Sequence, residues 1–198
     1  MCLRIVPYDS KYFEQCIKII QSNTPKYIDP SEHTDYKDYL SRPDAKNSIF
    51  DNGKTYFVLF KDSDLVACGG YGLNKSQTKV VLAWGLVHRK HHNQGYGSQL
   101  LKYRLKHIKS NYPDIEIHLD TSQHTFKFFE KFGFIVKQIS KNRYGEGLDA
   151  LRLLPWLCRS RWSAGAVRGH EVGGRTLGVH TRAPQGSGLY RGRCVARA

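Results

Sequence analysis

The sequence contains no apolar run that approaches the roughly 18 residues of a membrane-spanning helix. Its first residues, MCLRIVPYDSKYF, are interrupted by Arg4, Asp9 and Lys11, which argues against the hydrophobic segment of a signal peptide. The five cysteines are odd in number and include no Cys-x-x-Cys pair, which disfavours a disulfide framework and a structural zinc site. We therefore expect a cytoplasmic protein that does not associate with membranes.

Residues 155–198 lack Lys, Asn, Ile, Phe and Met altogether. They contain eight Arg and one acid, Glu171, and so carry half of the formal net charge of +14. Glycines recur every few residues, which opposes both helix and strand. We expect a disordered tail here. The switch from residues with AT-rich codons to residues with GC-rich codons indicates a shifted reading frame or a fusion. A basic arm that binds nucleic acid is the alternative interpretation.

The remaining residues, 1–154, have the patterns of a globular domain. Apolar residues at helical spacing predict helices over residues 11–22, 31–40, 97–109 and 123–131. Apolar runs bounded by turn residues predict strands over residues 3–7, 55–60, 65–72, 79–87, 115–119, 134–140 and 147–154. Three successive strands indicate antiparallel pairing, and the strand–helix–strand run from 79 to 119 indicates one parallel crossover. The predicted fold class is α+β, with a mixed, mainly antiparallel sheet flanked by helices.

The stretch VHRKHHNQGYGSQLL, residues 87–101, places two glycines between the predicted central strand and the next helix. Gly95 and Gly97 let a ligand approach the backbone, and a helix N-terminus offers N–H groups and positive partial charge. We consider three interpretations: a Rossmann dinucleotide site, a turn without a ligand, and a coenzyme A loop. Leu100 at the third glycine position and the antiparallel strands disfavour the Rossmann site. A turn without a ligand leaves the many hydrogen-bond donors of the stretch unexplained.

The same stretch resembles the coenzyme A loop of the GNAT N-acetyltransferase superfamily, whose pattern is Gln/Arg-x-x-Gly-x-Gly/Ala after a central strand. Downstream, TSQHTFKFFEKFGF resembles the family's next motif, a short helix that ends in Tyr-Glu-Lys-x-Gly-Phe. The predicted order of elements also matches the family, so the resemblance covers about residues 3–154 and none of the tail. It implies the GNAT, or acyl-CoA N-acyltransferase, fold and acetyl-CoA as the acyl donor.

The resemblance also implies a set of cofactor-binding residues. The loop would bind the pyrophosphate through its backbone amides, and the central strand would pair with the pantetheine arm. His92 stands where Gln or Arg is usual, and Ser122 stands where Asn is common. The implied cofactor-binding residues are Gly85, Val87, His92, Asn93, Gln94, Gly95, Tyr96, Gly97, Ser98 and Ser122.

The catalytic residues are less evident. Phe129 stands where the family often has a tyrosine that protonates the leaving thiolate, and a phenyl ring cannot do this. Tyr144, in the final hairpin, or water could supply the proton instead. The strand over 79–87 contains no acid, but His118 and Asp120 share one face of the following strand and are candidates for the base. The alternative for His118 is a half-buried strand residue with satisfied hydrogen bonds.

The resemblance implies direct attack of a neutral amine on the thioester of acetyl-CoA, with N–H groups of the central strand stabilising the oxyanion. The unfilled acid position leaves a non-catalytic acyl-CoA-binding protein of the same fold as an alternative. A nucleic-acid-binding protein is a further alternative that rests on charge alone. Adjacent histidines such as His91 and His92 rarely meet zinc geometry, so we expect no metal. The sequence does not identify the amine acceptor, and a homodimer is possible.

Overall fold

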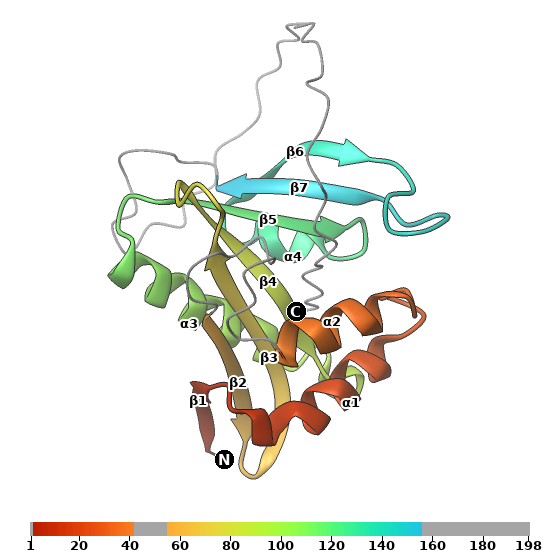
Figure 1. Ribbon diagram of the computed structural model, residues 1–198, viewed down its shortest axis with the longest axis vertical. Coiled ribbons are helices and arrows are strands. Elements are labelled where there is room, and N and C mark those ends of the chain that lie inside the picture. The colour runs from red at the N-terminus through yellow and green to blue at the C-terminus, as the bar shows by residue number, and fades with distance from the viewer. Residues whose placement is uncertain (1, 42–54, 156–198) are drawn as a thin grey trace, which may run out of the picture.

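The computed structural model describes residues 2–41 and 55–155 of the chain (Figure 1). The predicted tail lies outside the described residues except for Pro155, and the prediction about its disorder is therefore untested. In the described ranges, no helix is both long and apolar enough to cross a membrane.

Within the described residues, seven strands form one mixed sheet in the order β1-β2-β3-β4-β5-β7-β6. The strands are β1 (Leu3–Pro7), β2 (Thr55–Lys61), β3 (Asp64–Leu73), β4 (Lys79–Val87), β5 (Glu116–Ser122), β6 (Phe134–Ser140) and β7 (Ala150–Pro155). Every neighbouring pair is antiparallel except β4 and β5, which are parallel. The predicted α+β class with a mainly antiparallel sheet is confirmed.

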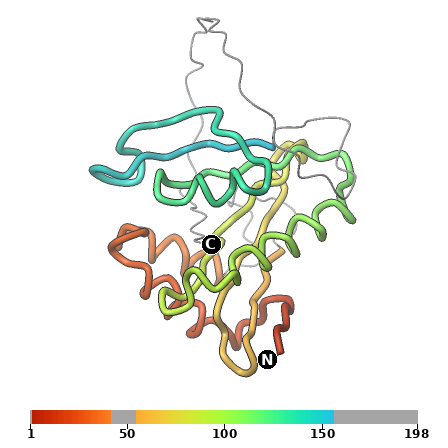
Figure 2. Tube along the Cα trace, turned by 180° about the vertical axis from the view of Figure 1, so that it is seen from behind, coloured from red at the N-terminus to blue at the C-terminus, as the bar shows by residue number. Residues whose placement is uncertain are grey.

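Helices cover both faces of this sheet. They are α1 (Phe13–Asn23), α2 (Glu32–Ser41), α3 (Tyr96–Asn111) and α4 (Phe126–Glu130), with short 3₁₀ turns at Ser10–Tyr12 and Arg89–His91. Helices α1 and α2 lie on one face, and α3 and α4 lie on the other, as the two opposite views show (Figures 1 and 2). Each face therefore has its own apolar core. One lies under α3 and α4 and includes Leu105 of α3, and the other lies under α1 and α2 and includes Ile20 of α1.

The predicted helix over 123–131 is shorter in the structure. Strand β5 continues to Ser122, and the amide of Thr125 donates to the carbonyl of Ser122 at 3.0 Å, so a turn precedes α4. The predicted strand over 147–154 also begins later, at Ala150. Gly145 and Gly147 both have positive φ angles, and they extend the turn before β7.

Strands β4 and β5 are paired only where they begin. Their register joins Lys79 to Glu116, Val80 to Ile117 and Val81 to His118. Beyond these residues the two strands diverge, and β5 pairs with β7 on its other side from Leu119 onward. A gap therefore opens within the sheet beside the second half of β4 (Figure 1).

Strand β4 also carries a bulge beside this gap. The register between β3 and β4 shifts, so that Trp84 and Gly85 together lie opposite Gly69. Trp84 has a φ of 42°, which is an outlier for a bulky residue, and its side chain is fully buried. The bulge turns the β4 backbone at the point where the gap is open.

Candidate functional site

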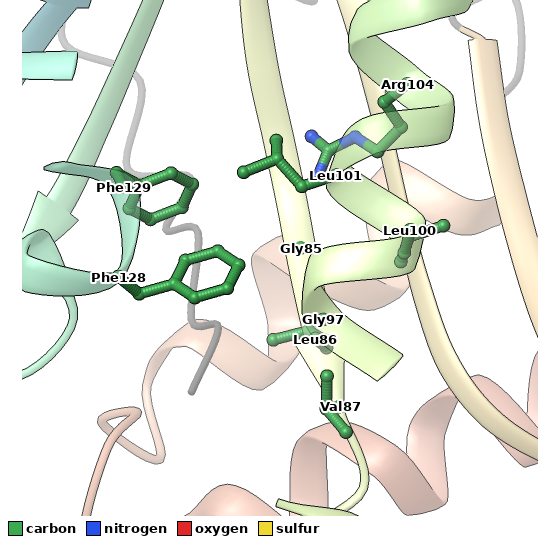
Figure 3. Close-up of a pocket in the computed structure, with 9 residues that line it drawn as sticks. All are labelled: Gly85, Leu86, Val87, Gly97, Leu100, Leu101, Arg104, Phe128 and Phe129. Atoms are coloured by element: carbon green, nitrogen blue, oxygen red, sulfur yellow. The ribbon is translucent and has the colours of Figure 1, made fainter. Parts of the chain in front are cut away.

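A narrow slot lies where β4 diverges from β5, between β4, α3 and α4 (Figure 3). About 240 Å³ of space lies between its walls when the part open to solvent is counted, and the slot has room for about one water molecule. Its lining residues are Gly85, Leu86, Val87, Gly97, Leu100, Leu101, Arg104, Phe128 and Phe129. The walls are apolar apart from the backbone and one guanidinium. Its apolar walls suit a thin, mostly apolar chain that parts them on entry, and its lining includes the predicted Gly85, Val87 and Gly97.

The glycine loop forms the mouth of this slot. Asn93 and Gly95 have φ angles of 61° and 82°, both in the left-handed region. Gly95 directly precedes α3, and no side chain caps the helix there. The first N–H groups of a helix have no partner within the helix, and here they belong to Tyr96, Gly97 and Ser98. The loop can therefore bind an anion through its backbone.

Two predicted side chains of the loop point back into it. Nε2 of His92 lies 3.0 Å from the carbonyl oxygen of Val87, and its ring packs on Tyr27 with 5.6 Å between centroids. Nε2 of Gln94 donates to the carbonyl of Lys90 at 3.1 Å. These contacts brace the loop, so that backbone amides are its main donors toward a ligand.

The bulge of β4 is held from both faces of the sheet. From the α1 and α2 side, the Tyr56 hydroxyl donates to the carbonyl of Trp84 at 3.0 Å. From the α3 side, Nη2 of Arg104 donates to the carbonyl of Ala83 at 3.3 Å and also to the carbonyl of Gly70. The backbone beside the slot is consequently fixed before any ligand arrives.

The residues predicted on β5 face the α1 and α2 side of the sheet. Leu119 belongs to the core under α3 and α4, and side chains alternate along a strand. His118, Asp120 and Ser122 therefore share the opposite face. Asp120 and Ser122 lie where β5 has left β4, so they border the gap.

His118 and its neighbour Glu116 form a close contact. Nε2 of His118 lies 2.9 Å from Oε2 of Glu116. Burial lowers the pKa of His118 below its ordinary value of 6.5, and the Glu116 carboxylate partly opposes this. The contact with His118 in turn lowers the pKa of Glu116. The His118 imidazole is consequently neutral at pH 7 and can accept a proton.

Arg152 links the other two predicted catalytic residues. Its Nε and Nη2 donate to the two carboxylate oxygens of Asp120, at 3.0 and 3.3 Å. These hydrogen bonds raise the pKa of Arg152, and the Tyr144 hydroxyl acts in the same direction. Tyr144 is buried in the turn between β6 and β7. The structure thus pairs Asp120 with Arg152, a residue that the sequence analysis did not single out.

Two buried polar atoms in the region where β4 and β5 diverge have no hydrogen-bond partner among the described residues. They are Oγ of Ser122 and Nε of Arg104, whose residues are 1% and 2% exposed. Unsatisfied buried polar groups are uncommon in native proteins and call for an explanation. A polar arm in the slot would pair with Nε of Arg104, whereas Ser122 lies outside the slot lining, on the opposite face of β5.

Phe129 lies in the slot wall, where it is 1% exposed. Its ring packs against Phe128 at 5.0 Å and Phe134 at 6.1 Å between centroids. The position often held by a tyrosine acid is therefore directed into the slot and provides no proton there. Within residues 2–41 and 55–155, no group of three His, Cys, Asp or Glu side chains could hold a metal ion.

The chain is similar to proteins of one family. A family model described as an acetyltransferase (GNAT) domain matches residues 22–153. No curated protein matches the sequence significantly.

Solved structures give the same fold. A protein assigned to the GNAT acetyltransferases from Desulfovibrio desulfuricans is 17% identical, with a TM-score of 0.64, and the match covers 77% of this chain and 98% of that one. An aminoglycoside 6′-N-acetyltransferase complexed with coenzyme A is 16% identical, with a TM-score of 0.61 and coverage of 80% and 99%. The ribosomal-protein-S18-alanine N-acetyltransferase of Escherichia coli is 14% identical, with a TM-score of 0.63 and coverage of 83% and 100%. The family model and the shared fold establish that the chain belongs to the GNAT acetyltransferase family.

Proposed function

We propose that this protein is an N-acetyltransferase that moves an acetyl group from acetyl-CoA to an amine by direct attack. The observation that carries the proposal is a single slot whose lining includes both the N-terminal end of α3 and the bulged part of β4. The mouth consists of the N-terminus of α3 and the left-handed Gly95. From β4 the slot is lined by Val87 and Gly85, the two predicted strand contacts.

The loop amides from Asn93 to Ser98 would hold the pyrophosphate, supported by the partial charge of the α3 N-terminus. The backbone of Gly85 and Val87 would pair with the amide-bearing arm, and Ser122 would bind it from the β5 side. Acetyl-CoA supplies an activated thioester whose acetyl group is the group transferred. N–H groups of the bulged β4 would stabilise the oxyanion that forms during attack.

His118 is our candidate for the group that takes the amine proton. Its imidazole is neutral at pH 7 because burial lowers its pKa, and it faces the side of the sheet opposite α3. Asp120 is engaged by Arg152, so we assign this carboxylate to positioning Arg152 and Tyr144 rather than to proton abstraction. Tyr144 would border the acceptor at the β6–β7 turn.

Two of the similar structures are named as N-acetyltransferases, of an aminoglycoside and of a ribosomal protein alanine. Both names specify an amine acceptor, which supports transfer to nitrogen in this chain. Because the two acceptors differ greatly in size, they do not narrow the acceptor further.

A second candidate function is acyl-CoA binding without catalysis. Two observations favour it: Phe129 offers no proton, and the Asp120 carboxylate is already paired. The two functions share the donor site, and release of free thiol in the presence of amines distinguishes them.

Calorimetry of the full chain with acetyl-CoA tests the donor site. Gly97→Trp would fill the mouth, and Gly95→Val would strain a backbone position with a φ of 82°. We expect both variants to lose at least about tenfold in affinity, which corresponds to about 1.4 kcal/mol. Gly147→Ala, at another left-handed glycine with open space around it, is the matched control and should bind normally.

Failure of the unmodified chain to bind acetyl-CoA would contradict both candidate functions. Binding without thiol release from a broad panel of amines would favour the non-catalytic one.

A further inference from the structure

We propose that Arg104 is a catalytic residue that stabilises the thiolate leaving acetyl-CoA, an inference that rests on the proposed transferase function. The guanidinium would take over electrostatically the role that a tyrosine acid often has in this family and that Phe129 cannot perform.

Arg104 lies deep in the slot. It belongs to α3, seven residues beyond Gly97 at the mouth, which is about 10 Å along the helix. Its side chain is 2% exposed and forms part of the slot lining together with Gly85 of the bulge. Figure 3 shows the guanidinium between α3 and β4, on the side of the helix that faces the slot. The reacting end of a donor whose phosphates bind at the mouth would lie near this depth.

The guanidinium has no counter-ion among the described residues. Nη2 donates to two backbone carbonyls, those of Gly70 and Ala83, and Nε has no acceptor. A buried cation without an anionic partner is costly, because it has lost its hydration. An anion that forms in the slot would be stabilised by this charge more strongly than in water, since the surroundings are apolar.

The backbone is shaped to hold the guanidinium at this point. A Cβ atom on Gly69 would lie 3.0 Å from Nη1 of Arg104, closer than ordinary packing permits. The absence of a side chain at Gly69, opposite the bulge, therefore creates the recess for the cation. A residue on the polar face of α3 would need no such recess.

The step balances without a further reagent. The amine nitrogen bonds to the acetyl carbon, the carbon–sulfur bond breaks, and its electron pair stays on sulfur. The extra proton of the new amide nitrogen passes to His118. The sulfur remains a thiolate opposite Arg104 and takes its proton from water after release. Since a free thiol has a pKa of about 8.5, a nearby cation can make this thiolate a good leaving group.

The alternative is a purely structural role, in which Arg104 only holds the bulge through the carbonyls of Gly70 and Ala83. Such a role would leave the acidity of a bound thiol unchanged. The thiol of coenzyme A itself is therefore the probe, and the measurement needs no turnover.

The test is an ultraviolet pH titration of the thiolate of coenzyme A bound to the full chain, with the desulfo analogue subtracted to remove protein signals. We expect the pKa of the bound thiol to lie below about 7.5, within the range that cations impose on cysteine. Arg104→Met should return it to the ordinary value. Lys106→Met, which removes a charge from the exposed face of the same helix, should change nothing.

Each other outcome overturns the inference. A bound thiol with its ordinary pKa in the unmodified chain does so directly, and so does a lowered pKa that persists in Arg104→Met. If Arg104→Met does not fold, Arg104→Gln, which keeps a hydrogen-bond donor but not the charge, takes its place, and a lowered pKa that persists in Arg104→Gln is equally decisive. If coenzyme A does not bind at all, the proposed function fails first, and this result is distinguishable from the others.

Turnover gives an independent test. We expect Arg104→Met to lower kcat by about 10²-fold while KM for acetyl-CoA changes by less than about threefold. Phe129→Tyr should then restore at least about tenfold in the Arg104→Met background but increase kcat less than about threefold in the unmodified chain. Equal effects of Phe129→Tyr in both backgrounds would show that Arg104 and the acid position act independently, and would overturn the inference.

Discussion

Two neighbours set the protonation of His118 in opposite directions. Burial lowers the pKa of its imidazole below 6.5, whereas Glu116, 2.9 Å away, raises it. Unfolding would restore the ordinary pKa, so the unfolded chain binds this proton more readily than the folded chain. The associated contribution to stability is present above pH 6.5 and is lost as the pH falls through and below 6.5.

The pH dependence of acetyl transfer should follow the protonation of His118. If neutral His118 accepts the amine proton, kcat/KM should fall as the pH decreases, with a midpoint below 6.5. Glu116→Gln removes the group that raises this pKa and should move the midpoint to a still lower pH. His118→Gln should lower kcat by about 10²–10⁴-fold and abolish this limb. His107→Gln, whose ring contacts Tyr71 of β3 outside the slot lining, is the control. An unchanged acid limb in His118→Gln would rule out this role.

Two arginines, Arg104 and Arg152, are the clearest examples of residues that sequence reasoning missed. Arg104 is three residues beyond Leu101 and so lies on the inward stripe of the helix, but a charged residue there would normally be assigned to solvent. Arg152 became recognisable only through the register that places it opposite Asp120 on β5. That register joins strands far apart in the sequence, and local patterns do not specify it.

Elements were predicted well where one pattern dominates. The continuous apolar run predicted β4, and the amphipathic pattern predicted α3. The predicted ends of both elements lie within two residues of the observed ends. The bulge was not foreseen, because a tryptophan with positive φ has no local signal and is imposed by tertiary packing. The glycine loop could be located from sequence alone, since its spacing is local. The divergence of β4 from β5 could not, because it depends on β7 pairing with β5.

The recess opposite the bulge leads to a prediction about β3. Gly69→Ala would place a Cβ atom 3.0 Å from both Nη1 of Arg104 and Cα of Gly85. We expect a loss of about 1–3 kcal/mol in the free energy of unfolding, as in overpacked cores. Combining it with Arg104→Met should reduce the loss, because the more flexible side chain can move aside. Urea denaturation of the unmodified chain, the two single variants and the double variant measures these free energies of unfolding. Additive losses would contradict the packing argument.

The second half of the sheet should depend strongly on its inner strand β7. Leu153 is fully buried and packs in the core under α3 and α4, so Leu153→Ala should cost about 2–5 kcal/mol. Ile139, on the edge strand β6, is 59% exposed, and Ile139→Ala should change the free energy of unfolding by less than about 0.5 kcal/mol. Thermal or urea unfolding would compare the two, and similar losses would contradict the assigned burial.

At the scale of the whole molecule, the domain boundary near residue 154 stays a prediction; among the described residues, the last strand ends at Pro155. The match to the family model ends at residue 153. We predict that a chain ending after Pro155 keeps the melting temperature within about 4 °C, which corresponds to less than about 1 kcal/mol, and binds acetyl-CoA unchanged. A chain that fails to fold without residues 156–198 would show that the tail belongs to the domain.

The divergence of β4 and β5 also bears on aggregation. A strand edge with unpaired N–H and C=O groups is normally a hazard, because another chain can add to it. Here two such edges face each other inside one sheet, with α3 and α4 on one side and α1 and α2 on the other. A second polypeptide strand would have to lie about 5 Å from both β4 and β5. The helices on both faces and the narrow slot leave no route by which such a strand could enter. The unpaired N–H and C=O groups in the gap can therefore bind a thin ligand but cannot pair with a strand of another protein.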